Sequence, residues 1–206
     1  QGRQSSGFSI DQMPDIIERF FRRFGKQTSN YYALRRVDPS YRIFYENEFI
    51  DVPAGVPSLC ELFERFERGS AKSLLKFLDE SAFKYVTAMH HLVYKPRLSW
   101  RELADVKLLK NAWRLNLLQP HATYIRKFFK DTRLVRLLEF PILFLGASSD
   151  KIPALYSLMN YADMALGTWY PMGGMYKVVE SIVRLAEGYG VTFQYNTPVT
   201  RIVAHR

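Results

Sequence analysis

Residues 154–203 read ALYSLMNYADMALGTWYPMGGMYKVVESIVRLAEGYGVTFQYNTPVTRIV, and this stretch decides the fold class of the chain. Residues 168–171 are extended and aromatic, and Gly173-Gly174 predicts a tight turn. An amphipathic helix is expected over residues 175–189, because apolar side chains recur there at helical spacing. Two short strands are then expected, over residues 191–195 and 199–203. Strand, turn, helix and strand in this order are typical of an α/β region.

Upstream of this stretch the pattern predicts mostly helix. Tyr41, Ile43 and Tyr45 alternate with other side chains and predict a strand, which a turn at Asn47-Glu48 folds into a hairpin with residues 49–52. Ser58 with Glu61, and Ser99 with Glu102, match capping boxes, and Asp131 is a further candidate cap. Helices are expected over residues 13–24, 58–66, 70–93, 99–118, 120–129, 131–145 and 153–166. The fold class is therefore α+β, rich in helix, with a small antiparallel sheet.

Composition limits the classes of protein that this chain can represent. Hydrophobic residues make up 48% of 206 residues, which is enough for a core. The single cysteine, Cys60, excludes a disulfide framework within the chain, favours a reducing, cytoplasmic compartment and is expected to be a buried, inert thiol. No signal peptide or membrane-spanning segment is recognisable. The net charge of +9 fits nucleic acid, an anionic membrane surface or an acidic partner, and does not choose among them.

Four features of residues 154–203, taken in order, carry a resemblance to a known family. They are a PALYSLMNY helix, the GTWYPMGGM element, a helix ending in LAEGYGV, and NTPVTRI. This ordered set resembles phytoene desaturases and other carotenoid desaturases among the amine-oxidase-like FAD flavoproteins. Farther upstream, YRIFYEN and FLGASSDKIPALY are also similar, so the resemblance covers nearly everything from Met13 onward.

The resemblance implies an enzyme with a two-part flavin domain and a substrate domain. No G-x-G-x-x-G fingerprint follows a strand here, so this sequence resembles the substrate-side region of such an enzyme. The sequence also begins without Met and ends within an expected strand, which we interpret as an internal piece of a longer protein. Residues 1–12 show no periodicity and are expected to be non-native or disordered. Residues 13–167 would form the helical, membrane-facing substrate region, and residues 168–206 an incomplete return toward the flavin domain.

The same resemblance assigns candidate site residues. Desaturation of a long hydrocarbon needs a flat, apolar slot beside the flavin, and aromatic side chains supply such walls. Trp169, Tyr170 and Pro171 are the candidate substrate-binding residues, although a strand that ends in a turn explains them equally well. Gly173 and Gly174, which allow close backbone approach, are candidate cofactor-binding residues. Val199, after Pro198, matches the position that meets the adenine end of FAD in this superfamily.

No catalytic residue is assigned by the sequence. The histidines, at positions 90, 91, 121 and 205, lack metal-ligand spacing, so no metal is expected. Asp150, Asp163 and Glu180 are carboxylates that could assist proton removal. FAD is expected in the intact enzyme, with none bound by this piece alone, which is expected to be inactive.

A polyene substrate does not dissolve in water, so peripheral contact with a bilayer is expected. Residues 20–24, 125–130 and 133–145 mix cations with large apolar side chains, which suits an anionic lipid surface and also suits ordinary amphipathic helices. Related polyene isomerases, saturases and ketolases remain open. Nucleic acid is not an expected partner, because no recognisable motif is present and the cations are spread over many helices. A basic module that binds nucleic acid and a helical interaction scaffold are the alternatives to the enzyme.

Overall fold

The computed structural model describes residues 14–45, 48–90 and 114–203. Within these ranges the α-helices are α1 (Pro14–Arg22), α2 (Val56–Phe66), α3 (Ser70–Ala88), α5 (His121–Ile125), α6 (Thr132–Glu139), α7 (Leu158–Tyr161) and α8 (Tyr176–Glu187). Short 3₁₀ segments are η1 (Thr28–Asn30), η4 (Phe140–Leu145) and η5 (Ala154–Ser157), and η6 (Ala162–Leu166) is a π-helical segment. Two antiparallel pairs form small sheets, β1 (Leu34–Arg36) with β4 (Trp169–Pro171) and β2 (Tyr41–Phe44) with β3 (Phe49–Val52). The α+β prediction is confirmed.

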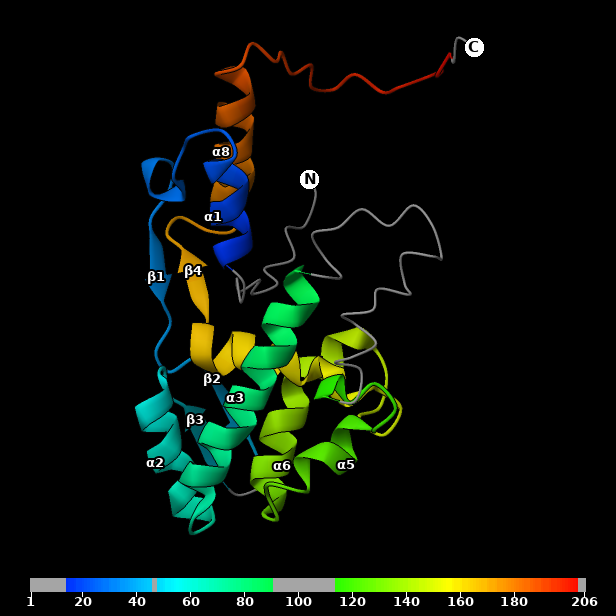
Figure 1. Ribbon diagram of the computed structural model, residues 1–206. Helices are drawn as coiled ribbons and strands as arrows, with labels where there is room; N and C mark the ends of the chain where they lie inside the picture. The colour runs from blue at the N-terminus through cyan, green and yellow to red at the C-terminus, as the bar shows by residue number, and fades with distance from the viewer. Residues whose placement is uncertain (1–13, 46–47, 91–113, 204–206) are drawn as a thin grey trace.

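The elements are arranged as a helical body and an arm (Figure 1). We define the helical body as β2, β3, α2, α3, α5, α6 and the segments η4 to η6, and the arm as α1, β1, β4 and α8. In the arm, α1 and α8 lie side by side above the β1–β4 pair, and residues 191–203 lead away from the end of α8. The β1–β4 ribbon joins the arm to the body (Figure 1).

The core of the body is built from aromatic and branched side chains. Phe77 of α3 meets Tyr124, Phe128 and Phe129 with ring centroids 5.5–6.0 Å apart, and Phe63 of α2 meets Phe129 at 5.3 Å. Leu134, Leu137 and Leu138 of α6 are fully buried in the same cluster. This packing explains why α6 is helical, since its apolar stripe has a surface to cover.

Local chemistry sets the helix ends, and one of the expected caps differs. The carboxylate of Asp131 accepts a hydrogen bond from the Arg133 amide at 2.8 Å, so Asp131 is the N-cap of α6, as predicted. The Ser58–Glu61 capping box is wrong, because α2 begins at Val56 after Gly55, with proline in its first turn. At α3, Glu64 from the preceding helix accepts from the Gly69 and Ala71 amides.

Other boundaries are also corrected by the structure. The helix expected over residues 153–166 is divided into η5, α7 and η6, and the one expected over 131–145 changes to 3₁₀ near Pro141, which cannot donate a backbone hydrogen bond. The β2–β3 hairpin is confirmed, and so are the arm helices α1 and α8. The expected helix at 99–118, with its Ser99–Glu102 capping box, lies mostly outside the described residues.

The strand pair expected after α8 is wrong. Residues 191–203 carry no strand, and Val199 and Ile202 are 81% and 88% exposed. Alternating residues become a strand only where a neighbouring strand takes their backbone hydrogen bonds and a layer covers their apolar face. The described part of this chain offers neither beside these residues.

Candidate functional site

The GTWYPMGGM element begins where the body ends and β4 starts. Gly167 has φ +90°, and a Cβ at this position would lie 2.7 Å from Nε of Arg36, so only glycine fits without displacing that side chain. Arg36 stands opposite Trp169 in the β1–β4 register. Its Nε is buried and has no hydrogen-bond partner among the described residues.

The candidate substrate residues occupy the whole of β4. Trp169 and Tyr170 are half-buried, and Pro171 is buried. The Trp169 indole Nε1 donates to the carbonyl of Leu166 at 2.9 Å, which fixes the orientation of the ring. Tyr170 pairs with Arg35, and Pro171 with Leu34. The predicted extended aromatic segment is therefore confirmed as structure, and its role stays a prediction.

The expected glycine turn follows directly. The Gly174 amide donates to the carbonyl of Pro171 at 3.0 Å, and both glycines have positive φ, 92° at Gly173 and 98° at Gly174. A Cβ on Gly173 would meet the Lys177 side chain at 3.1 Å, whereas Gly174 faces only the Tyr170 hydroxyl, at 3.8 Å. The backbone at Gly174 is thus open to close approach by a flat group.

Val199 does not join these residues. Helix α8 separates it from the glycines, and 12 helical residues span about 18 Å. Val199 lies in the exposed segment beyond α8. The described residues therefore supply separate surfaces that a flavin could touch, and they do not form a flavin pocket on their own.

The three candidate carboxylates are also apart from one another. Asp163, 2% exposed, accepts from the Tyr41 hydroxyl at 2.9 Å and from the Thr168 hydroxyl at 3.2 Å. Burial, and then the Asp163 charge, raise the pKa of Tyr41 well above its usual value. This network ties β2 of the body to the start of β4. Asp150 lies in an exposed turn, and Glu180 pairs with Lys177 on the surface of α8.

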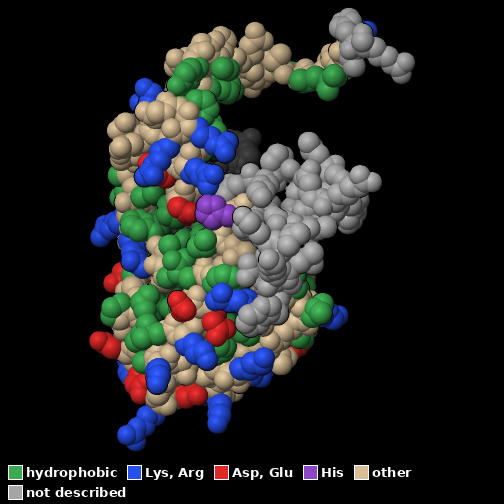
Figure 2. Space-filling model, in the orientation of Figure 1, with side chains coloured by type: hydrophobic (Ala, Val, Ile, Leu, Met, Phe, Trp, Pro, Cys, Tyr) green, Lys and Arg blue, Asp and Glu red, His purple; other side chains and the backbone are tan. Residues whose placement is uncertain are grey.

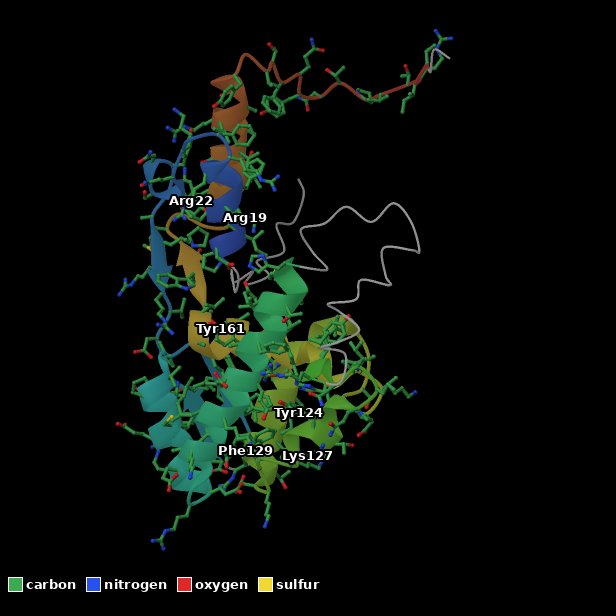
Figure 3. All side chains as sticks on the ribbon, viewed as in Figure 1. Arg19, Arg22, Tyr124, Lys127, Phe129 and Tyr161 are labelled. Carbon is green, nitrogen blue, oxygen red and sulfur yellow. The ribbon has the colours of Figure 1, made fainter. Side chains whose placement is uncertain are left out.

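A buried polar cluster in the body was not predicted from the sequence. Lys84 of α3 is fully buried, and its Nζ donates to the Ala154 carbonyl at 3.1 Å and the Ser157 hydroxyl at 3.0 Å. It also lies 3.6 Å from the centroid of the Tyr124 ring, whose hydroxyl donates to Glu80 at 2.6 Å. Burial lowers the pKa of Lys84 to about 7 and raises that of Tyr124. Tyr124, labelled in Figure 3, is a residue of α5 whose ring contacts Phe77 and Lys84 of α3.

His121 and Asn160 complete this cluster. Both are fully buried, and both approach the carbonyl of Leu138, at 3.5 Å from His121 Nε2 and 2.7 Å from Asn160 Nδ2. Burial lowers the pKa of His121 to about 4, so the ring is neutral at physiological pH. The cluster holds α3, α5, α6 and α7 together, and it lies inside the body rather than beside β4.

Within the described residues, Cys60 and the histidines form no metal or nucleophile site. Cys60 is half-buried rather than buried, and its pKa is raised by burial and by Glu64, which keeps the thiol protonated. Across the described ranges, no group of three His, Cys, Asp or Glu side chains could hold a metal ion. In the same ranges, no helix combines the length and apolar character needed to cross a bilayer.

Comparisons with known proteins place the chain in a family. The model of flavin containing amine oxidoreductases matches residues 6–206, and the chain belongs to this family. A carotenoid 3,4-desaturase of Haloarcula japonica is 36% identical over 204 residues, which is 95% of this chain and 41% of that protein. A zeta-carotene-forming phytoene desaturase of Myxococcus xanthus is 31% identical over 96% of this chain and 38% of that protein.

A third relative, a 4,4'-diapophytoene desaturase of Staphylococcus aureus, is 25% identical over 96% of this chain and 39% of its own length. The chain thus spans about two fifths of the length of the curated relatives that it matches. The family resemblance inferred from residues 154–203 is confirmed.

Proposed function

We propose that this chain is the substrate-side part of an FAD-dependent carotenoid desaturase, an oxidoreductase that acts on CH–CH bonds of a polyene. The observation that carries the proposal is the alignment of carotenoid and phytoene desaturases along 95–96% of the chain, including the β4 element and its glycine turn. The Trp169 ring, fixed by its bond to Leu166, is suited to form one wall of an apolar slot.

The remainder of the longer protein would supply most of the flavin pocket. FAD accepts hydride from carbon when bound. The open backbone at Gly174 supports its proposed role next to the flavin ring, and Gly173 shapes the turn. Val199 would reach the adenine end only after residues 191–203 pair with strands of that remainder. The exposure of Tyr176, Val179 and Ile182 on α8 supports residues 168–206 as the segment that packs against it.

We further propose that residues 13–167 take up a carotenoid from a bilayer, with the protein bound peripherally to the cytoplasmic face of the membrane. Long polyenes partition into hydrocarbon, so the enzyme must approach the lipid to find its substrate. Exposed apolar side chains such as Leu118 and Leu143 support such contact.

The test uses the full-length protein, supplied with FAD and with phytoene in liposomes, and measures loss of phytoene and gain of longer conjugated chromophores. Trp169→Ala should lower turnover at least tenfold while flavin absorbance is retained. The matched control is Phe44→Ala, which removes an aromatic side chain that is 75% exposed at the far hairpin. Turnover that is unaffected by Trp169→Ala would remove Trp169 from the site, and absence of any polyene product would overturn the proposed function.

A further inference from the structure

A cavity of about 490 Å³ lies between α3 and the segment that surrounds α5. Its lining includes Lys72, Lys76, Glu80, Asn116, Tyr124 and Lys127. Three lysines therefore face one carboxylate. On this part of the visible face Figure 2 shows Lys and Arg side chains with Asp and Glu side chains between them, and Lys127, which follows α5, is labelled in Figure 3.

The single carboxylate of the cavity is already engaged. Glu80 accepts the Tyr124 hydroxyl at 2.6 Å, and the buried Lys84 ammonium lies behind the same ring. Lys127 donates to the Gln119 side-chain oxygen at 3.0 Å, which leaves its other two N–H groups for a ligand. In the described ranges no carboxylate forms an ion pair with Lys72, Lys76 or Lys127, so the described lining of the cavity carries an excess of positive charge.

A turn with leucine at both central positions lies beside this cavity. The Gln119 amide donates to the Asn116 carbonyl at 3.3 Å, and Asn116 adopts φ +50°, so residues 116–119 form a turn. Its two central residues are Leu117 and Leu118, which are 42% and 99% exposed. Turn centres normally carry Gly, Pro, Asn or Asp, which water solvates well, so two leucines at this position call for an apolar contact.

We propose that this surface binds an anionic phospholipid, with the phosphate in the lysine cavity and the leucines of residues 117–118 in the acyl region. A free phosphate would explain the lysines and would leave the leucines in water, which is why the lipid is the better occupant. The inference rests on the proposed function, because it gives the bilayer contact of the substrate region a location and a lipid chemistry.

The test measures sedimentation of the full-length protein with vesicles of phosphatidylcholine alone and of phosphatidylcholine with 30% phosphatidylglycerol. The double variant Lys72→Gln/Lys76→Gln should weaken binding to the anionic vesicles by about 25-fold, since each lysine near an anionic surface contributes roughly fivefold. The charge-matched control, Lys26→Gln/Lys177→Gln, removes two exposed lysines of the arm and should weaken it far less. Leu118→Ser should reduce binding at least fivefold, and Leu143→Ser should reduce it less.

Equal losses from the two lysine pairs would overturn the proposal, because the charge effect would then be non-specific. Competition by millimolar inorganic phosphate together with no effect of Leu118→Ser would overturn it in favour of a soluble anion site. Melting curves confirm that each variant is folded, and Lys76→Arg should restore binding where Lys76→Gln loses it. Desaturation of a polyene delivered in detergent tests the proposed function separately, since that assay needs no vesicle binding.

Discussion

The helical body and the arm differ in how their apolar side chains are covered. In the body, Phe63, Phe77 and Phe129 are fully buried against one another. In the arm, α8 lies beside α1 (Figure 1), where Tyr189 donates to the Phe24 carbonyl at 3.2 Å, and Val179 and Ile182 of α8 are exposed. The body has a core of its own, whereas α8 carries apolar side chains that no described residue covers.

This difference separates stability from function within the chain. The dense core and the buried polar cluster fix the relative positions of the body helices. The candidate site residues, in contrast, lie outside this core: five are on β4 and in the turn that leads to α8, and Val199 is in the exposed segment beyond α8. A site outside the core can be completed by another part of a protein, and the comparison can be tested by substitutions on either side of it.

The largest effect is expected from Phe77→Ala in the body. The ring contacts three aromatic side chains, so its removal should cost about 3–5 kcal/mol of unfolding free energy. Its counterpart beyond the arm, Phe193→Ala, alters an exposed side chain that is 38% accessible, and it should cost less than about 0.5 kcal/mol. Urea denaturation followed by circular dichroism measures both free energies of unfolding. Similar costs for the two substitutions would contradict the difference in packing between the body and the exposed segment.

Acid should destabilise the body through His121. Its folded pKa of about 4 lies below the usual 6.5, so the unfolded chain binds the proton first and stability falls as pH drops from 6.5 to 4. Two and a half pKa units correspond to a loss of about 3 kcal/mol. Unfolding free energies measured between pH 7 and pH 4 check this, with His121→Gln as the variant whose pH profile should be flatter. An unchanged profile would assign the acid sensitivity to carboxylates.

Mild alkali should stabilise the body through Lys84. Its folded pKa of about 7 lies below the usual 10.5, so the folded chain releases the proton first and the cost of the buried charge disappears as pH rises above 7. From pH 7 to pH 9 the unfolding free energy should increase by about 2 kcal/mol. Lys84→Met should abolish this increase. A decrease over the same interval would show that the ammonium is stabilised rather than penalised by its surroundings.

The junction between body and arm is tested by Tyr41→Phe. This change removes the hydroxyl that Asp163 accepts at 2.9 Å and leaves a buried carboxylate with one partner fewer, which should cost about 1–2 kcal/mol. Tyr45→Phe is the matched control, since that hydroxyl makes only a 3.4 Å contact with the Arg133 carbonyl. Hydrogen exchange should report faster opening of the β1–β4 pair in Tyr41→Phe, and a change confined to the body would contradict the assigned junction.

The sequence predicted elements whose partners are local. The β2–β3 hairpin and α8 follow from alternation and helical periodicity alone, and Asp131 was identified as a cap from its position. The β4 segment and its glycine turn were identified from the aromatic and glycine residues. The strands at 191–203 could not be judged in this way, because a strand depends on a neighbour that may be far away in the sequence.

The buried polar cluster depends on contacts between residues far apart in the sequence, which local patterns do not predict. Lys84 resembles a solvated charge in the sequence, yet it lies seven residues after Phe77 and three after the buried Ser81, which places it on the inward face of α3. This helical spacing was the feature of the sequence that could have predicted the burial of Lys84. Its carbonyl and hydroxyl partners, Ala154 and Ser157, lie about seventy residues away, and no local pattern could pair them with it.

The smallest effect is expected on the exposed side of α8, from Ile182→Ser. Ile182 is 41% exposed, so the substitution should change the unfolding free energy of this chain by less than about 0.5 kcal/mol. If the rest of the longer protein covers this face, the same substitution there removes buried area and should cost about 2 kcal/mol. Thermal denaturation of both forms measures the difference. Equal, small costs in the two would mean that this side of α8 faces solvent in the longer protein, and residues 168–206 would then lose their proposed role as the segment that packs against the flavin domain.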